Sequence, residues 1–139
     1  MSEQPNTAVV QGLYAAFMRG DVPFILNSIA DKVEWHHHGP IDVIPWAKSR
    51  HTRDEVAEFF TELDKLVTFE QFEPRTYVAQ GDTVVALGYW KARAKATGRP
   101  IEEYWAMEWT LADGKVIGYR AYDDTAAIAA ALSPEPARV

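Results

Sequence analysis

The hydrophobic period of this chain changes once along its length, and that change limits the folds open to it. Apolar residues recur three and four positions apart in the segments 7–19, 22–30 and 52–66, but alternate with a period of two between residues 68 and 122. Helices that precede a run of strands indicate an α+β fold rather than βαβ units. With 139 residues, the chain has the usual length of one domain with a sizeable core. The sequence therefore predicts a single domain in which helices cover one face of a curved antiparallel sheet.

Cap and turn residues mark the ends of the predicted elements. Gly20 is suited to end the first helix, and Pro23 suits the first turn of a short second helix. Thr52 and Glu55 have the spacing of a capping box, which predicts the start of a third helix. The predicted strands cover residues 33–38, 68–79, 83–96, 101–111 and 116–122, followed by a terminal helix over 125–132 and a Pro-rich, frayed tail over 133–139.

The charge and composition argue against several classes of partner. A net charge of -6 gives no electrostatic attraction to nucleic acid or to anionic membrane surfaces. The chain has no cysteine, which rules out disulfides and thiol chemistry and suits a reducing compartment. Its start lacks the basic and apolar segments of an export signal, so we expect a cytoplasmic protein. Since no dinucleotide, phosphate-loop or haem motif is present, no cofactor is expected.

The aromatic residues predict an apolar pocket. They make up 12% of the chain and include five tryptophans, which is rich for this length. Because side chains alternate along a strand, Val33, Trp35 and His37 share one face of the first strand. The matching faces of two later strands carry Trp105, Met107, Trp109 and Leu111, and Ile117, Tyr119, Ala121 and Asp123. A sheet curled over helices brings these faces together around a cavity, in which His37, Tyr119 and Asp123 are the few polar groups.

Several local strings, taken in order and spacing, resemble the nuclear transport factor 2-like superfamily and its SnoaL-like and ketosteroid isomerase-like members. They are VVQGLYAAFMRGD (9–21), VEWHHHGPIDVIPWA (33–47), TRDEVAEFF (52–60), QGDTVVALGYW (80–90), TGRPIEEYWAMEWTL (97–111) and DGKVIGYRAYDD (113–124). The resemblance covers about residues 8–130. It implies a single SnoaL-like domain with a cone-shaped curved sheet packed against three N-terminal helices, and a homodimer formed through the sheet. Members of this superfamily include isomerases, cyclases, epoxide hydrolases, dehydratases and non-catalytic binders, so the fold alone does not give the function.

The resemblance to ketosteroid isomerases does not extend to their catalytic residues. The Tyr donor on their opening helix corresponds to Leu13, and Tyr14 lies one position away, a step that turns a helical side chain by about 100°. Their Asp general base falls near Trp35 or His36, and their protonated Asp falls near Met107. None of these three roles is filled by a residue of the same kind.

Two other catalytic sets of the superfamily give one partial match. The Arg and the two Asp of its epoxide hydrolases fall on Gly88, Trp90 and Ala121, so that chemistry is absent. SnoaL-type cyclases carry an acidic acid/base residue near the end of the last strand. This chain offers Asp123 and Asp124 there.

The polar pocket residues have two interpretations. In the functional one, His37 and Asp123 act as acid and base on a bound carbon acid, because an imidazole titrates near neutrality and an apolar cavity raises a carboxyl pKa toward it. In the structural one, His37 is a hydrogen-bonded core residue and Tyr119 a packed ring. Asp123 or Asp124 would then cap the helix over 125–132.

The histidine run 36–38 raises the question of a metal. Neighbouring strand residues point to opposite faces, so only His36 and His38 share a face, and a third ligand would come from His51 or an acidic residue. Solvent-facing or interface histidines are the simpler explanation, and we expect no metal. Trp46 is expected either as a lid over the mouth of the cone or as a plug in the core.

The sequence thus predicts a protein that holds a small apolar or aromatic molecule. It either shifts a proton on that molecule, as an isomerase, cyclase or lyase does, or acts as a non-catalytic binding or dimerisation module. The candidate catalytic residues are His37 and Asp123. The candidate ligand-binding residues are Tyr14, Phe17, Trp35, Trp46, Phe59, Trp90, Trp105, Met107 and Tyr119.

Overall fold

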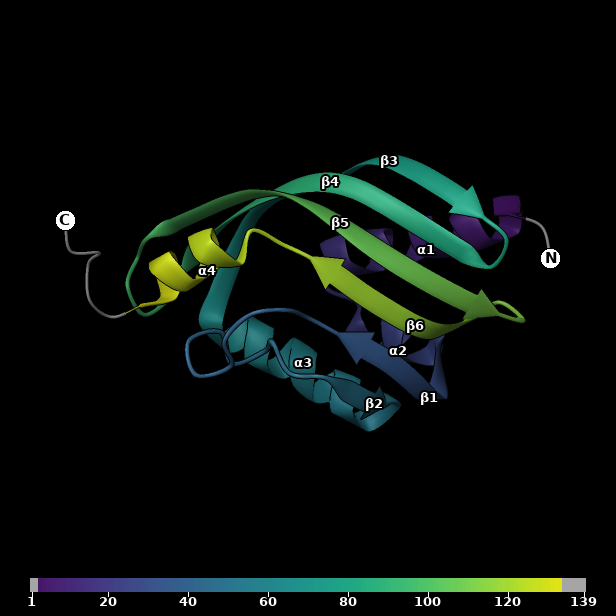
Figure 1. Cartoon of the computed structure of the whole chain (residues 1–139), viewed down its shortest axis with the longest axis horizontal. Helices are drawn as coiled ribbons and strands as arrows, with labels where there is room; N and C mark the ends of the chain where they lie inside the picture. The colour runs from purple at the N-terminus through teal and green to yellow at the C-terminus, as the bar shows by residue number, and fades with distance from the viewer. Residues whose placement is uncertain (1–2, 134–139) are drawn as a thin grey trace.

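The computed structural model describes residues 3–133, which form one six-stranded sheet with helices against it (Figure 1). The strands follow the order β2-β1-β6-β5-β4-β3 across the sheet. The elements are α1 (Glu3–Met18), α2 (Val22–Asn27), β1 (Ile29–His36), β2 (Arg50–Thr52), α3 (Arg53–Leu66), β3 (Val67–Gln80), β4 (Thr83–Ala94), β5 (Pro100–Ala112), β6 (Lys115–Tyr122) and α4 (Thr125–Leu132). The α+β class predicted from the sequence is confirmed.

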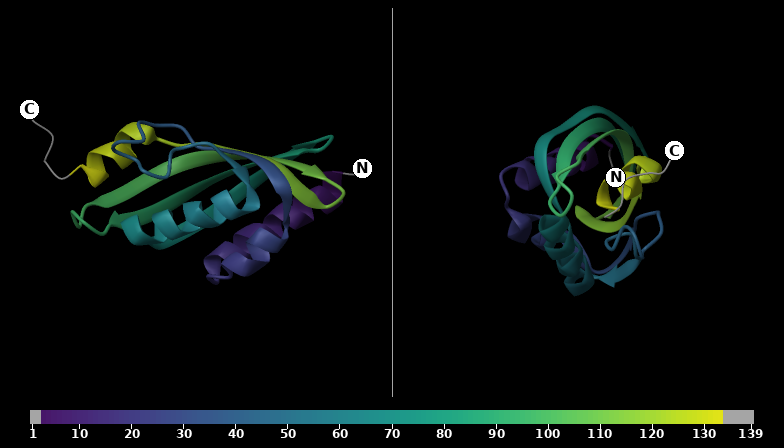
Figure 2. Two further views of the ribbon diagram at one scale, coloured as in Figure 1. Left: turned by 90° about the horizontal axis from the view of Figure 1, so that it is seen from below. Right: turned by 90° about the vertical axis from the view of Figure 1, so that its left-hand side faces the viewer.

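The sheet is curved but does not close. Seen end-on in Figure 2, the strands curl around a central space, and α1, α2 and α3 lie along the side that the sheet leaves open. Every strand pairing is antiparallel except that of β1 with β6, which is parallel. A parallel pair needs a long crossover between its strands. Here the chain from β2 to β5 supplies it, and this pairing could not be seen in the local sequence pattern.

Capping side chains fix two of the helix starts. The Thr52 hydroxyl accepts a hydrogen bond from the Glu55 backbone N–H at 3.2 Å, and the Glu55 carboxylate accepts one from the backbone N–H of His51 at 2.6 Å. The predicted start of the third helix is therefore confirmed. At α4 the cap is Asp124, whose side chain accepts from the Ala127 N–H at 3.1 Å. This leaves the preceding residue, Asp123, free to face elsewhere.

Some element boundaries differ from the predicted ones. Helix α1 begins at Glu3, four positions before the predicted residue 7, because Pro5 lies in the first turn, where no backbone N–H is needed. Helix α2 ends at Asn27, since Ile29 already starts β1, and β1 ends at His36 rather than at residue 38. Strand β2 was not predicted, because three residues are too few to show a period.

The predicted inward position of Ile117 is wrong. Its side chain is 38% exposed, and Val116 is buried instead. The cause is an irregularity in the β5–β6 ladder, where the register shifts between Thr110 and Leu111. A bulge of this kind reverses the alternation of the residues beyond it. From Tyr119 onward the predicted faces hold, since Tyr119 and Ala121 are buried.

Within residues 3–133 no helix is long and apolar enough to cross a membrane. The predicted frayed tail over 133–139 lies, apart from Ser133, outside the described residues.

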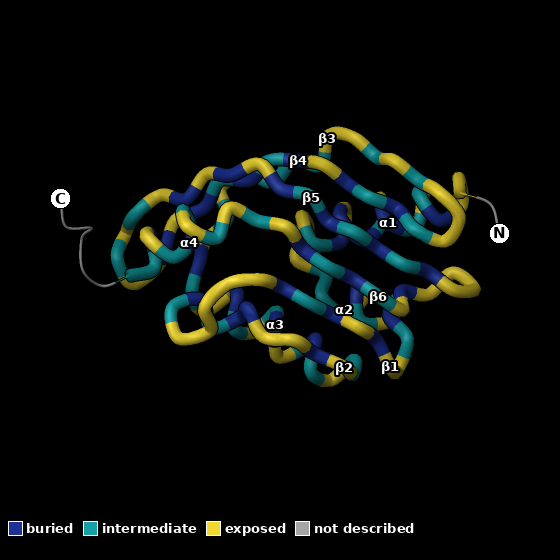
Figure 3. Tube along the Cα trace, viewed as in Figure 1, coloured by how far each residue is buried: buried dark blue, intermediate teal, exposed yellow. Residues whose placement is uncertain are grey.

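The core lies between the concave face of the sheet and the helices, and buried and exposed residues alternate along β4 and β5 (Figure 3). Gly88 occupies an inward position on β4, where the Trp105 indole fills the space beside it. A Cβ atom at Gly88 would lie 2.4 Å from both the Glu73 carbonyl oxygen and Trp105 Cζ2. The tryptophan-rich core therefore depends on a missing side chain at this point.

We expect Gly88→Ala to lower the free energy of unfolding by about 2–3 kcal/mol, because the backbone of β3 cannot yield as a flexible side chain would. The matched control is Gly12→Ala in α1, where no atom lies within 4 Å of the added Cβ. That change should raise the unfolding free energy by about 0.5–1 kcal/mol. Urea unfolding of both variants measures the difference. Equal stability of the two would contradict the close packing described at Gly88.

Candidate functional site

A cavity of about 70 Å³ lies between the concave face of the sheet and the helices. Most of its wall is aromatic or aliphatic, and its polar groups besides the tryptophan N–H groups come from Tyr14, His37, Tyr119 and Asp123. The lining residues are Leu13, Tyr14, Phe17, Ile25, Trp35, His37, Trp46, Phe59, Phe60, Leu63, Phe69, Phe72, Trp90, Met107, Trp109, Tyr119, Asp123 and Ile128.

Both candidate catalytic residues and eight of the nine candidate ligand-binding residues line this cavity. The ninth, Trp105, is buried outside the lining. It stacks on Phe72 with ring centroids 5.2 Å apart and lies 5.6 Å from the Tyr14 ring. Trp105 thus supports two lining residues from behind.

His37 is a neutral imidazole in an apolar wall. It follows β1 directly and stacks on Phe59, with centroids 4.5 Å apart and planes at 25°. Its Nδ1 atom is buried and has no hydrogen-bond partner among residues 3–133. Burial, together with the positive charge of Arg50, lowers the pKa of His37 to about 3. The ring therefore remains uncharged at neutral pH and can exchange hydrogen bonds with a ligand.

The two tyrosines of the cavity differ in how their hydroxyl groups are used. Tyr14 donates to Met107 Sδ at 3.2 Å and accepts from Trp109 Nε1 at 2.8 Å, so its hydroxyl is engaged within the protein. Tyr119 stacks on Trp35, with centroids 4.0 Å apart, and its hydroxyl has no hydrogen-bond partner among residues 3–133. Burial raises the pKa of both groups well above the ordinary value, so both stay protonated.

Asp123 brings a carboxyl group to the cavity and has a second carboxyl group beside it. This neighbour is Glu103 on β5, which is only 3% exposed. Glu103 Oε1 accepts from the Asp124 backbone N–H at 2.5 Å, and its side chain lies within hydrogen-bond reach of the Asp123 carboxyl group. Burial raises the pKa of both groups, that of Glu103 to about 10.

Glu103 was missed in the sequence analysis, although a signal was present. The alternation that places Trp105 and Met107 on the inner face of β5 also places residue 103 there. A single charged residue at the end of such a row is more often solvated than buried. Its position in the row was nevertheless the one available sign that this acid faces the core.

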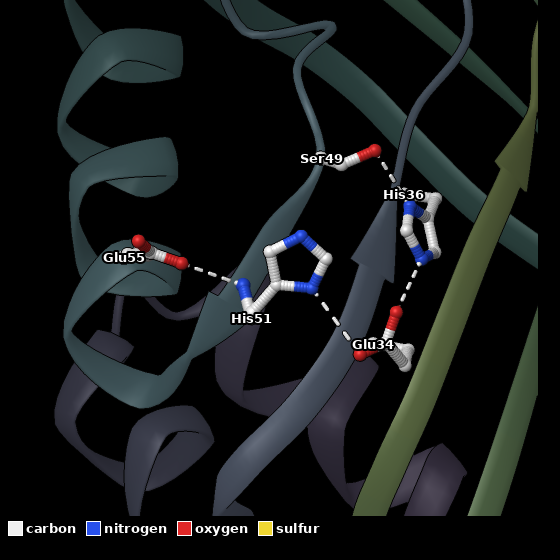
Figure 4. A network of polar contacts seen from close by, with 5 residues as sticks. All are labelled: Glu34, His36, Ser49, His51 and Glu55. Atoms are coloured by element: carbon white, nitrogen blue, oxygen red, sulfur yellow. Dashed lines mark hydrogen bonds and ion pairs between the residues drawn. The ribbon is translucent and has the colours of Figure 1, made fainter.

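The three successive histidines have separate environments, and His36 belongs to a surface network (Figure 4). Its two ring nitrogens lie 2.7 Å from Ser49 Oγ and 3.0 Å from Glu34 Oε1. The other Glu34 oxygen lies 3.2 Å from His51 Nδ1. The hydrogen bonds from His51 and His36 lower the pKa of Glu34. The network ties the end of β1 to β2.

No group of three histidine, aspartate or glutamate residues in the described part of the chain is arranged to hold a metal ion. In place of the shared ion considered from the sequence, His36 takes part in the surface network and His38 stacks on Tyr122, with centroids 5.5 Å apart.

Trp46 is buried in the loop between β1 and β2, and it lines the cavity. The buried Arg50 anchors the loop, because its guanidinium donates to the Trp46 carbonyl oxygen at 2.9 Å and to the Lys48 carbonyl oxygen at 3.2 Å. The Arg50 guanidinium also pairs with Glu62 at 2.5 Å. Trp46 is therefore a fixed part of the cavity wall in this structure.

A wider hollow of about 820 Å³ adjoins the cavity at a different wall, between the end of α1, α3 and the start of β3. Five residues line both spaces, namely Phe17, Phe60, Leu63, Phe69 and Phe72. The four phenylalanines are only partly buried. They form the partition between the cavity and the outer hollow, and the polar rim of the hollow includes Lys65 and Lys95.

The SnoaL-like domain family matches residues 10–119. This chain belongs to that family. An NTF2-like protein from Burkholderia xenovorans LB400 is 32% identical over 96% of this chain and 99% of its own, with a TM-score of 0.86. An NTF2-like protein of unknown function from Burkholderia pseudomallei K96243 is 25% identical over the same shares, also with a TM-score of 0.86. A candidate isomerase from Bacillus subtilis is 16% identical over 98% of this chain and 99% of its own, with a TM-score of 0.83, and shows the fold alone. Among curated proteins, none matches this SnoaL-like chain by sequence.

The burial of His37 predicts a specific acid sensitivity. Between the ordinary pKa of 6.5 and the folded value of about 3, the imidazole binds a proton only in the unfolded chain, so stability falls as the pH drops through this range. From pH 7 to pH 5 this group should cost about 2 kcal/mol, at about 1.4 kcal/mol for each unit below 6.5. We expect His37→Phe to lose that share of the acid sensitivity in urea unfolding at both pH values. An unchanged difference in His37→Phe would contradict a buried neutral imidazole.

Proposed function

We propose that this SnoaL-like protein binds a small, mostly apolar molecule in its cavity and moves a proton on it, in an isomerase, cyclase or lyase type of reaction. The observation that carries the proposal is the presence of a carboxyl group able to exchange a proton, Asp123, together with the neutral imidazole of His37 on the wall of one aromatic cavity. Acid/base chemistry by side chains requires groups of this kind next to the bound substrate.

Each polar group of the cavity has a role that follows from its environment. Asp123 is the general base, because burial raises its pKa and makes its carboxylate a stronger proton acceptor than an exposed one. Tyr119 and the neutral His37 are the hydrogen-bond partners of a substrate oxygen, on which negative charge develops when the proton leaves. The mechanism needs no organic cofactor.

The cavity also restricts the size and charge of the ligand. Its volume of about 70 Å³ is below the roughly 150 Å³ of an apolar cavity that holds benzene, so a ring-sized ligand displaces part of the wall. No Lys or Arg lines the cavity. A neutral molecule with one polar substituent is therefore a better ligand than an anion, which would meet the negative charge of Asp123 without a cation to balance it.

A non-catalytic binding module is the second candidate, and the packing of the cavity favours it. Trp35 stacks on Tyr119 and contacts Phe59, which packs edge-on against Phe60. The Tyr14 hydroxyl is engaged with Met107 and Trp109. Such a wall binds an apolar molecule well without reacting with it. Under either proposed function, we propose that the protein is located in the cytoplasm.

Deuterium exchange separates the two candidates. Neutral aromatic ketones and phenols that quench the tryptophan fluorescence are selected as ligands, and their exchange of C–H protons in D₂O is followed by ¹H NMR. We expect exchange with the wild-type protein and a loss of at least about 100-fold in Asp123→Asn, as for removal of a general base. Asp124→Asn is the matched control, because asparagine also caps a helix and this residue lies outside the cavity lining.

Binding without exchange for every ligand would leave the non-catalytic module as the function. Equal loss of exchange in Asp123→Asn and Asp124→Asn would show that the effect comes from α4 and not from the cavity.

We also propose that the protein forms a homodimer through the outer face of the sheet. On that face, neighbouring strands β4, β5 and β6 pair Leu87 with Ala106 and Ala106 with Tyr122. Tyr104 is 74% exposed, and its ring centroid lies 5.3 Å from that of Tyr89. An apolar, aromatic row of this kind is typical of subunit interfaces.

Tyr104→Glu should convert the dimer into monomers in analytical ultracentrifugation, because it introduces a charge at the centre of the proposed interface. Its unfolding free energy, measured at a concentration where both proteins are monomeric, should change by less than about 0.5 kcal/mol. A monomeric wild-type protein at high concentration would refute the dimer.

A further inference from the structure

We infer that Glu103 and Asp123 hold one proton between them at neutral pH, and that Glu103 keeps it and directs the Asp123 carboxylate toward the cavity. Glu103 is thereby a positioning residue for Asp123. The role in proton transfer rests on the function proposed above, whereas the shared proton does not.

The surroundings of Glu103 require a proton on this pair. Its Oε1 atom accepts from the Asp124 N–H, while its Oε2 atom is buried and receives no hydrogen bond from any N–H or hydroxyl group of residues 3–133. The remaining polar group within reach is the Asp123 carboxyl group. Two ionised carboxylates only accept hydrogen bonds and repel each other, so their contact is stable when one of them is protonated and donates.

No Lys or Arg side chain compensates the pair. Within residues 3–133 neither carboxyl group forms an ion pair with Lys or Arg. The charged and titratable groups that face the pair from other elements are His38 after β1, Asp124 at the start of α4, Tyr14 on α1 and Tyr119 on β6. Asp124 adds negative charge and both tyrosines are neutral, so a proton is the means of balancing the second carboxylate.

Glu103 is the member that holds the proton. It is the more deeply buried of the two, and burial together with the negative charge of Asp123 raises its pKa to about 10. Burial raises the pKa of Asp123 as well, but the hydrogen bond from Glu103 and the nearby His38 oppose this change. The pair therefore carries a single negative charge at neutral pH, and that charge lies on the residue that lines the cavity.

This arrangement has a defined consequence for a proton transfer at Asp123. The hydrogen bond from the Glu103 carboxylic acid engages one Asp123 oxygen and leaves the other for the cavity. When a substrate C–H bond breaks, its proton goes to that free oxygen and its electron pair stays on the substrate. The pair then holds two protons and no charge, and the same oxygen returns the proton to a different atom of the substrate.

The shared proton is testable without knowing the substrate. We expect the ¹³C signal of the Glu103 side-chain carboxyl carbon to keep the chemical shift of a protonated acid from about pH 4 to above about pH 8. Asp123 should titrate at a lower pH than Glu103. Signals are assigned with Glu103→Gln and Asp123→Asn. Glutamine retains an oxygen for the Asp124 N–H and an N–H donor for Asp123, so the fold and the Asp123 position should persist. Glu102→Gln is the control. The Glu102 carboxylate accepts a hydrogen bond from the Tyr89 hydroxyl and takes no part in the pair, so this substitution should leave the Glu103 signal unchanged.

An ionised Glu103 signal already at about pH 6 in the wild-type protein would overturn the inference, whether or not the Gln variant folds. So would an unchanged Glu103 titration in a folded Asp123→Asn variant, because loss of the Asp123 charge should lower the pKa of Glu103. A protonated Glu103 in a protein that exchanges no deuterium into any ligand would support the shared proton and refute only the proposed reaction. Deuterium exchange into a ligand by a protein whose Glu103 is ionised would support the proposed reaction and refute the shared proton.

Discussion

The stack of Trp35 on Tyr119 is the interaction on which the rest of the site depends. These two rings lie 4.0 Å apart, are paired in the parallel ladder of β1 and β6, and belong to strands that are far apart in the sequence. Because the two strands run in the same direction, the residues that follow Trp35 and Tyr119 project toward the same end of the cavity. His37 and Asp123 are those residues. An antiparallel pairing would have sent them to opposite ends.

The same aromatic packing determines the protonation states inside. A buried group in an apolar wall is held in its neutral form, whatever its type. The pKa of His37 therefore falls and the pKa values of Tyr14, Tyr119 and Glu103 rise, all with burial as the largest cause. Asp123 escapes full neutralisation because Glu103 donates to it. One carboxylate in a wall of otherwise neutral groups is what a base for a weak carbon acid requires.

The sequence was most informative where side chains alternate regularly and least informative where distant segments meet. The alternation correctly predicted that Trp35, Met107 and Tyr119 face inward, and it failed at Ile117 because a ladder irregularity in β5–β6 has no marker in the sequence. The parallel β1–β6 pairing joins segments about 85 residues apart, so no local pattern encodes it. The partnership of Glu103 with Asp123 is invisible for the same reason. The catalytic roles of His37 and Asp123 stay predictions.

The cavity has two walls that differ in the interactions that hold them in place. The loop with Trp46 is anchored by the buried Arg50, whose hydrogen bonds to the Trp46 and Lys48 carbonyl oxygens would be lost if the loop lifted. The opposite wall consists of partly buried phenylalanine rings that separate the cavity from the outer hollow. These rings are held by aromatic contacts, such as that of Phe17 with Phe72 at 4.9 Å between ring centroids, and not by hydrogen bonds. The phenylalanine wall is therefore the more weakly anchored of the two, and Trp46 belongs to the firmly held side of the cavity.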